Sequence, residues 1–257
     1  MINLSDSDVA LAAATAGAAV VRDMYGTRLD RVDKGGGDFA TAADLAAEQA
    51  ILDVIRRERP ADGFLGEENG QIGDATGRQW LVDPLCGTLN YAAGMRVVAV
   101  NVGLSGGASA VADPFGGEVY YTDGVTARVR RGDADEVLAP SAANGLVEFN
   151  LDAPFPSAPA FRVARVLADT RFIERFRPRV VSSTLAVAWV AAGKRAAYLS
   201  DGGDLTASVH FAAGLAVCRD AGCVLTDLDG EPLGPGARGL VAAADAETHA
   251  ALMELIA

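Results

Sequence analysis

Apolar positions near the start of the chain recur with the spacing of an amphipathic α-helix. The apolar residues that share one helical face within 5–28 are Val9, Ala13, Val20 and Met24. A second pattern of this kind predicts a helix over 41–59, with Pro60 beyond its end. Between these two helices, the glycine-rich run 34–38 predicts a flexible loop.

Further along the chain, the pattern changes to short apolar runs separated by turn residues. Residues 80–82 have the pattern of a buried strand, and 83–88 that of a turn leading into a short helix. Four more runs, separated by Gly or Asp-Pro turns, predict an antiparallel sheet: 97–104, 108–112, 118–122 and 127–130. We interpret the proline-containing stretch 132–160 as the joint between two halves of the protein.

The remainder of the chain alternates helical and strand patterns, which predicts an α/β half. The predicted helices are 160–172, 183–192, 208–221 and a terminal helix from Ala246. The predicted strands are 179–181, 196–199, 224–227 and 240–243. The predicted domains are therefore 1–135, with helices and the antiparallel sheet, and 136–257, an α/β half that completes the site.

The net charge and the cysteine content indicate which kinds of partner and which cellular location to expect. The chain has 257 residues, and its 22 basic against 34 acidic side chains give a net charge of −12. This charge repels polyphosphate backbones and anionic lipids, so we expect neither nucleic acid nor a membrane surface as a partner. The first residues include acids where a secretory signal carries basic residues, and three cysteines are too few for a disulfide framework. We therefore expect a cytoplasmic protein.

Two short motifs carry a resemblance to a known family. The chain reads G-E-E at 66–68 and D-P-L-C-G-T at 83–88, directly after a predicted strand. These motifs resemble the G-E-E turn and the D-P-hydrophobic-D-G-T motif of the inositol monophosphatase family. Other motifs of that family follow in the same order over nearly the whole length. The resemblance implies an α+β or α/β fold, a layered αβαβα sandwich of the sugar-phosphatase type. It also implies a small-molecule substrate and a homodimer.

The resemblance also implies Mg²⁺ ions held by carboxylates, an arrangement suited to a hard cation. The implied ligands of the first metal are Glu67, Asp83 and the backbone carbonyl of Leu85. Asp44 and Thr88 resemble the pair that helps to activate the water.

The phosphate-binding segments of the family have counterparts as well. The positions of Gly87 and Thr88 match those whose backbone amides hold phosphate at a helix start. Lys34, beside three glycines, resembles the lysine of the family's mobile loop and would support an anionic substrate.

The chain departs from the family pattern at two positions, and both are ligands of the second metal ion in that pattern. The second acid of its D-P-x-D motif is Cys86 here, and the Asp of its W-D-x-A-A-G motif is His210. A thiol and an imidazole are poor ligands for Mg²⁺, which keeps to oxygen.

The sequence prediction is a thiol–imidazole enzyme without a cofactor. Cys86 would attack an acyl or thioester-type small substrate in a transfer, hydrolysis or cyclisation. His210 would accept the thiol proton, and Asp83 would orient the imidazole. The amides of Gly87 and Thr88 would stabilise the oxyanion. The helix start that follows Cys86 is expected to favour its thiolate.

Two alternatives stay open at this point. One is a metal-dependent phosphate monoester hydrolase with one Mg²⁺ at Glu67, Asp83 and Leu85. In a variant of it, Zn²⁺ replaces the second ion, because Asp, Cys and His suit a softer metal. The other is a catalytically inactive scaffold that binds a partner protein or a small ligand.

Overall fold

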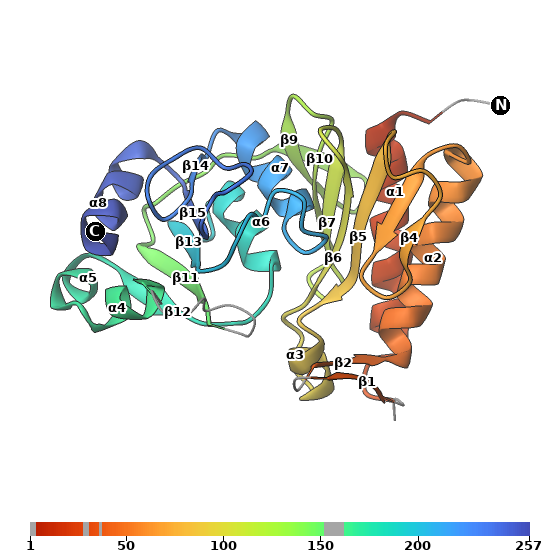
Figure 1. Ribbon diagram of the computed structural model, residues 1–257, viewed down its shortest axis with the longest axis horizontal. Coiled ribbons are helices and arrows are strands. Elements are labelled where there is room, and N and C mark those ends of the chain that lie inside the picture. Colours follow the sequence, from red (N-terminus) through yellow and green to blue (C-terminus); the bar gives the residue numbers. More distant parts are fainter. Residues whose placement is uncertain (1–3, 28–30, 36–37, 152–161) are drawn as a thin grey trace.

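Layers of helix and sheet alternate through the computed structural model, which describes residues 4–27, 31–35, 38–151 and 162–257 (Figure 1). Helices α1 (Asp6–Asp23) and α2 (Ala42–Glu58) cover one face of an eight-stranded sheet. Helices α6 (Leu185–Ala191) and α7 (Ala212–Ala221) lie between this sheet and a five-stranded one.

The far face of the five-stranded sheet carries the remaining outer layer. Its helices are α4 (Arg162–Ala168), α5 (Thr170–Arg175) and α8 (Ala246–Ile256). The αβαβα sandwich expected from the sequence is therefore confirmed.

The larger sheet has the strand order β10-β9-β8-β7-β6-β5-β3-β4. Its strands are β3 (Gly63–Gly66), β4 (Gly70–Ile72), β5 (Gln79–Cys86), β6 (Ala99–Leu104), β7 (Ser109–Asp113), β8 (Glu118–Thr122), β9 (Ala127–Arg131) and β10 (Ala134–Val137). Neighbouring strands are antiparallel except β3 and β5, which are parallel. The antiparallel arrangement predicted for β6 to β9 is confirmed.

The smaller sheet has the order β12-β11-β13-β15-β14 and is mixed. Its strands are β11 (Leu146–Asn150), β12 (Arg177–Arg179), β13 (Ala197–Ser200), β14 (Val224–Thr226) and β15 (Leu240–Ala243). Strand β11 is parallel to both of its neighbours, and the other pairs are antiparallel.

The predicted turn at 83–88 was wrong, because β5 continues to Cys86. Strand β5 pairs with β6 across an irregularity between Asp83 and Cys86, where one extra residue lies opposite the partner strand. Pro84 falls within this bulge, a place where a strand tolerates a missing N–H donor. The bulge bends the end of β5 and brings several candidate site residues together.

Other boundary predictions also needed correction. The supposed joint 132–160 contains β10 and β11, while 152–161 lie outside the described residues. The predicted loop 34–38 contributes to a two-stranded hairpin of β1 (Arg31–Gly35) and β2 (Asp38–Thr41), with 36–37 outside the described residues. Helix 160–172 divides into α4 and α5, because Asp169 caps a new helix by accepting a hydrogen bond from Arg171 N–H.

Some helix and strand boundaries also differ by a few residues from the prediction. Helix α1 ends at Asp23 rather than Arg28, and α7 begins at Ala212 rather than Ser208. Strand β12 lies two residues before the predicted 179–181.

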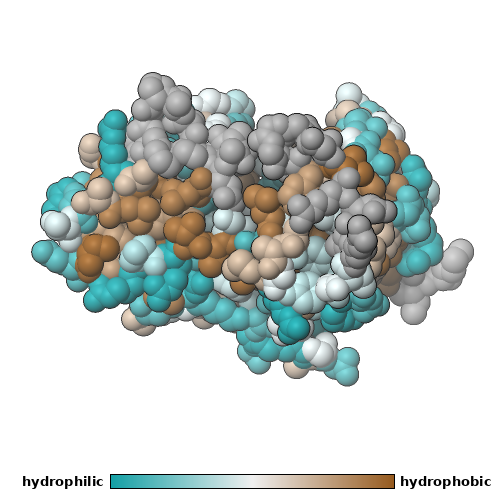
Figure 2. Space-filling model, turned by 90° about the horizontal axis from the view of Figure 1, so that it is seen from below, coloured by the Kyte–Doolittle hydropathy of each residue, from teal (hydrophilic) through white to brown (hydrophobic). Residues whose placement is uncertain are grey.

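None of the helices in the described part of the chain combines the length and the apolar character needed to span a bilayer. The underside of the molecule, where α3 (Thr88–Ala92) and the β1–β2 hairpin lie, shows apolar patches beside polar ones (Figures 1 and 2). Large exposed apolar side chains in these segments include Val32 and Leu89.

Candidate active site

Four segments that are distant in sequence supply the candidate site. They are the end of β5, the start of α2, the turn after β3 and the segment before α7. The predicted residues on them are Asp83, Leu85, Cys86, Asp44, Glu67 and His210. Gly87 and Thr88 follow β5 directly at the start of α3. The fold therefore gathers these residues in one place.

Asp83 is the centre of this arrangement. Its side chain is fully buried, and its Oδ2 lies 2.7 Å from Nδ1 of His210. Its Oδ1 accepts a hydrogen bond of 3.0 Å from the Leu85 N–H. Burial by itself would raise the pKa of Asp83. The charge of the His210 imidazolium and hydrogen bonding with His210, Glu67 and Cys86 outweigh burial, so the pKa lies below its ordinary value.

Glu67 approaches the same imidazole nitrogen. Its Oε2 lies 3.9 Å from Nδ1 of His210, so two carboxylates converge on one atom. Glu67 is held in place by its backbone, because its N–H donates to the Val82 carbonyl of β5 at 3.0 Å. Two neighbouring carboxylates repel each other unless a cation lies between them.

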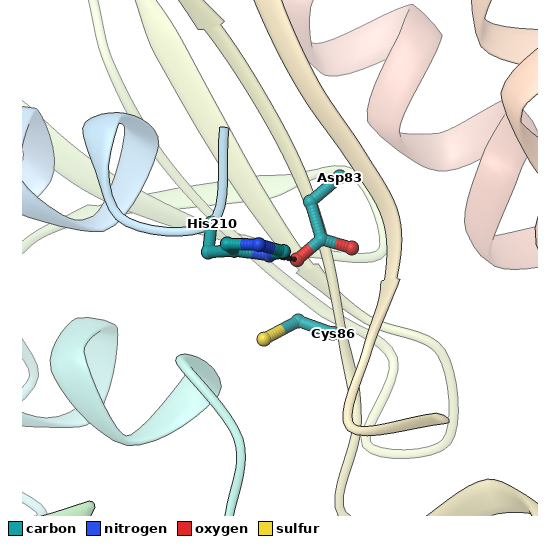
Figure 3. Close-up of side chains that lie close together, drawn as sticks. All are labelled: Asp83, Cys86 and His210. Carbon is teal, nitrogen blue, oxygen red and sulfur yellow. Dashed lines mark hydrogen bonds and ion pairs between the residues drawn. The ribbon is translucent and has the colours of Figure 1, made fainter. Parts of the chain in front are cut away.

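Cys86 completes a cluster with Asp83 and His210. One potential ligand atom of each residue lies within 4.8 Å of the others. The three side chains point toward one another, two from β5 and one from the segment before α7 (Figure 3). The sulfur also accepts a hydrogen bond from the Thr184 N–H at 3.4 Å.

The expectation that this position favours a thiolate was wrong. Burial and the nearby carboxylates of Asp83 and Glu67 raise the pKa of the Cys86 thiol well above its ordinary value. Hydrogen bonds from Thr184 act in the other direction but are weaker. In the absence of a cation, the thiol therefore stays protonated at neutral pH.

Asp44 and Thr88 form the second functional pair. The Thr88 hydroxyl lies 2.9 Å from Oδ1 of Asp44 and 3.1 Å from the Leu85 carbonyl oxygen. The other oxygen of Asp44 belongs to the capping box of α2 and accepts from the Thr41 N–H at 2.8 Å. Asp44 is buried, and its burial raises its pKa above the ordinary value. One carboxylate thus starts a helix and also orients a hydroxyl of the site.

Gly87 allows the sharp change of direction between β5 and α3. Its φ of 104° lies in the left-handed region, and a Cβ there would come 3.2 Å from the carbonyl oxygens of Ser182 and Val97. Ser182 itself has a φ of 52°, which is unusual for a residue other than glycine. The Asn90 side chain donates to the carbonyls of Val97 and Ser182 and ties these segments together.

Glu48 is a residue of this region that the sequence prediction missed. It is buried on α2, and its carboxylate accepts hydrogen bonds from the N–H groups of Glu68 and Asn69 at 2.9 and 2.8 Å. A Cβ at Gly66 would lie 2.5 Å from the same carboxylate, so any other residue there would displace Glu48. Glu48 therefore fixes the turn that carries Glu67. The available signal was a charged residue one turn after Asp44 on a largely apolar helical face.

Lys34 is the one predicted site residue that cannot be placed in full. Its backbone lies in β1, but its side chain falls outside the described part of the chain. Its predicted contact with an anionic substrate stays a prediction.

The groups of this site that could bind a metal ion are of two kinds. Glu67, Asp83 and the Leu85 carbonyl offer oxygen only, which suits Mg²⁺. Cys86 and His210 offer sulfur and nitrogen, which do not. The residues present therefore fit a magnesium ion at the first position of the family's pair and not at the second.

The family model described as the inositol monophosphatase family matches residues 4–257 of this chain. The chain belongs to the inositol monophosphatase family. A relative named inositol-1-monophosphatase ImpA, from Mycolicibacterium smegmatis, is 33% identical over 264 residues, covering 96% of this chain and 91% of the relative. An inositol-1-monophosphatase from Mesorhizobium japonicum is 31% identical over 231 residues, covering 85% of this chain and 84% of its own length.

Solved structures of this family share the fold. The extragenic suppressor protein SuhB of Bartonella henselae superposes with a TM-score of 0.81 at 23% identity, covering 97% of each chain. An IMPase of Thermotoga maritima gives 0.80 at 21% identity, covering 97% of this chain and 95% of its own. These likenesses extend over the whole sandwich.

Membership of the inositol monophosphatase family settles several expectations. The family resemblance is confirmed, and the family is one of phosphatases, which favours the phosphatase alternative over acyl or thioester chemistry. The Cys/His-based and transferase parts of the prediction have no support from the comparisons. The expectation of an enzyme that needs no cofactor has no support from this family, in which Mg²⁺ is required. The homodimer, the cytoplasmic location and the division at residue 135 stay predictions.

Proposed function

We propose that this chain hydrolyses a small phosphate monoester in a reaction that depends on a divalent cation. The observation that carries the proposal is the convergence of Glu67 and Asp83 beside the Asp44–Thr88 pair. Relatives named inositol-1-monophosphatase that align over most of the chain support the same class of reaction.

Glu67, Asp83 and the Leu85 carbonyl are the residues that would hold Mg²⁺. When bound, the ion supplies charge stabilisation to the phosphoryl oxygens. The interactions that the structure gives Asp83 prepare it for this role. The Leu85 N–H fixes one of its carboxylate oxygens, and its lowered pKa keeps it ionised at neutral pH.

Thr88 and Asp44 orient the attacking water. Because the Thr88 hydroxyl donates its hydrogen bond to Asp44, its oxygen is free to accept a hydrogen bond from the attacking water. The N–H groups of Gly87 and Thr88, at the first turn of α3, would hold phosphate oxygens. The residues of this chain thus position the nucleophile on one side and the phosphate on the other.

The experiment is a phosphate-release assay with Mg²⁺ on a panel of sugar, polyol, nucleotide and alkyl monophosphates. Glu67→Gln is expected to lower turnover about 100-fold or more, because a charged ligand is lost. Glu68→Gln is the matched control, since it changes the adjacent carboxylate, which is not among the proposed ligands. Equal activity of the two variants, or no phosphate release from any substrate, would overturn the proposal.

A further inference from the structure

We infer that Asp83, Cys86 and His210 form a site for a softer divalent cation, with Zn²⁺ as the reference ion. The inference deepens the proposed function, with which it shares Asp83. It concerns which metal the second position takes, and it is tested by metal binding rather than by turnover.

The distances suit such an ion. The three donor atoms lie within 4.8 Å of one another, and His210 Nδ1 and Asp83 Oδ2 are 2.7 Å apart. A tetrahedral zinc with bonds of about 2.0–2.3 Å requires its donors to be about 3.3–3.6 Å apart. Zinc binding therefore requires the Asp83–His210 contact to open slightly and the sulfur to stay within bonding distance. The ion also displaces the thiol proton of Cys86 and the proton between His210 Nδ1 and Asp83, and both protons are released to solvent.

Neighbouring groups hold these donors in place. The Leu85 N–H fixes one oxygen of Asp83 and leaves the other facing the imidazole. The Thr184 N–H donates to the Cys86 sulfur, a contact that suits a metal-bound thiolate. Thr184 is anchored in turn, because its hydroxyl accepts from the Asn101 side chain at 2.8 Å. Such supporting contacts orient ligands in metal sites.

The site is closed on the sheet side and open on the other. Asp83 is fully buried, whereas the His210 side chain is 39% exposed. This difference gives an ion a route of entry on the imidazole side. Three protein donors also leave one position of a tetrahedron for water or a phosphate oxygen, the donor count of catalytic zinc sites.

The donor atoms of this site determine which metal ion it would prefer. Oxygen-only sites suit Mg²⁺, whereas thiolate and imidazole favour later transition metals. Both substituted positions changed in the same direction, toward sulfur and nitrogen, and both lie on one ion position. A change of metal accounts for both substitutions together.

The test uses the full chain after chelator treatment and dialysis. Co²⁺ is added as a spectroscopic substitute for zinc, and a sulfur-to-cobalt charge-transfer band is recorded. Zn²⁺ affinity is then measured by competition with a chelating dye in excess Mg²⁺. The variants are Cys86→Ser, Cys86→Asp and His210→Asp. The matched control is Cys223→Ser, which removes a thiol at the opposite end of α7 from His210. Circular dichroism melting checks that each variant folds.

The wild type and Cys223→Ser are expected to show the band and to retain Zn²⁺ against Mg²⁺. Cys86→Ser and Cys86→Asp should lose the band, and each of the three site variants should bind Zn²⁺ about 100-fold more weakly. Absence of the band in the wild type, or its persistence in Cys86→Ser, would overturn the inference. Zinc binding without phosphate release from any monoester would instead overturn the proposed function alone.

Discussion

Glu118 and the site carboxylates are all withdrawn from solvent, but their partners differ. Glu118 accepts hydrogen bonds from Lys194, Arg131 and Tyr120. Burial would raise its pKa, but these partners outweigh burial and lower the pKa to about 2. Among the described residues, no lysine or arginine forms an ion pair with Asp44 or Asp83.

This difference indicates what each group of carboxylates does. Glu118 has a structural role, and its charge is neutralised by the lysine and arginine side chains that bind it. Asp44 has no such cation among the described residues, and its burial raises its pKa. Asp83 pairs with the partly exposed imidazole of His210 instead of a lysine or arginine. Buried carboxylates with perturbed pKa values are typical of functional sites. A bound metal ion would place further positive charge beside Asp83 and Glu67.

Asp83→Asn is expected to have the strongest effect on turnover. Because Asp83 belongs to both proposed ion positions, we expect phosphate release to fall about 1000-fold or more. The free energy of unfolding at pH 7 should fall, since the variant removes one partner of the Asp83–His210 ion pair, which keeps the pKa of Asp83 below its ordinary value. Turnover and urea unfolding measured on one preparation check both parts. Activity within tenfold of the wild type would refute the role given to Asp83.

The next effect concerns the water-orienting pair. Thr88→Ala should lower kcat about 100-fold with a small change in KM, because it removes the hydroxyl that orients the attacking water. Thr88→Ser keeps the hydroxyl and should recover most of the activity. Steady-state kinetics of the two variants test this expectation, and equal losses in both would show that Thr88 acts through packing.

A smaller effect is expected at Glu48, which is a positioning residue. Glu48→Gln weakens the hydrogen bonds that hold the turn of Glu67. The Mg²⁺ concentration for half-maximal activity should therefore rise about tenfold, while kcat at saturating Mg²⁺ stays nearly constant. A metal titration of activity separates this outcome from general destabilisation, which would lower kcat at every Mg²⁺ concentration.

The smallest effect falls on the structural side of the comparison. Glu118→Gln should leave phosphate release unchanged and lower the free energy of unfolding by about 2 kcal/mol at pH 7. The pKa of Glu118 is lowered from 4.5 in its ordinary state to about 2 in the fold. Its contribution is therefore complete above pH 5 and is lost as the pH falls toward 2. Urea unfolding of both proteins at pH 7, 4 and 3 should show the difference shrinking, and a constant difference would contradict this account.

Much of the fold was predictable because local patterns and tertiary contacts agree. Helix α2 has a capping threonine and an apolar face, and strands β6 to β9 alternate with Gly and Asp-Pro turns. The bulge at the end of β5 was not predictable in this way, because an Asp-Pro pair usually indicates a turn. Pairing with β6 overrides that preference.

The site was predictable in part for a similar reason. Motif positions placed Asp83, Cys86 and His210 in one cluster, and the structure brings them together. The protonation of Cys86 could not be predicted, because it depends on burial and on the distances to Asp83 and Glu67. Glu48 was missed because its role lies in contacts with a turn some twenty residues away.

The most direct test of the central claim is phosphate release by the wild-type chain before and after metal removal. We expect no turnover of the best monoester after chelation and dialysis, and recovery of turnover when Mg²⁺ is restored. Undiminished turnover in excess chelator would contradict a cation-dependent phosphatase at Glu67 and Asp83.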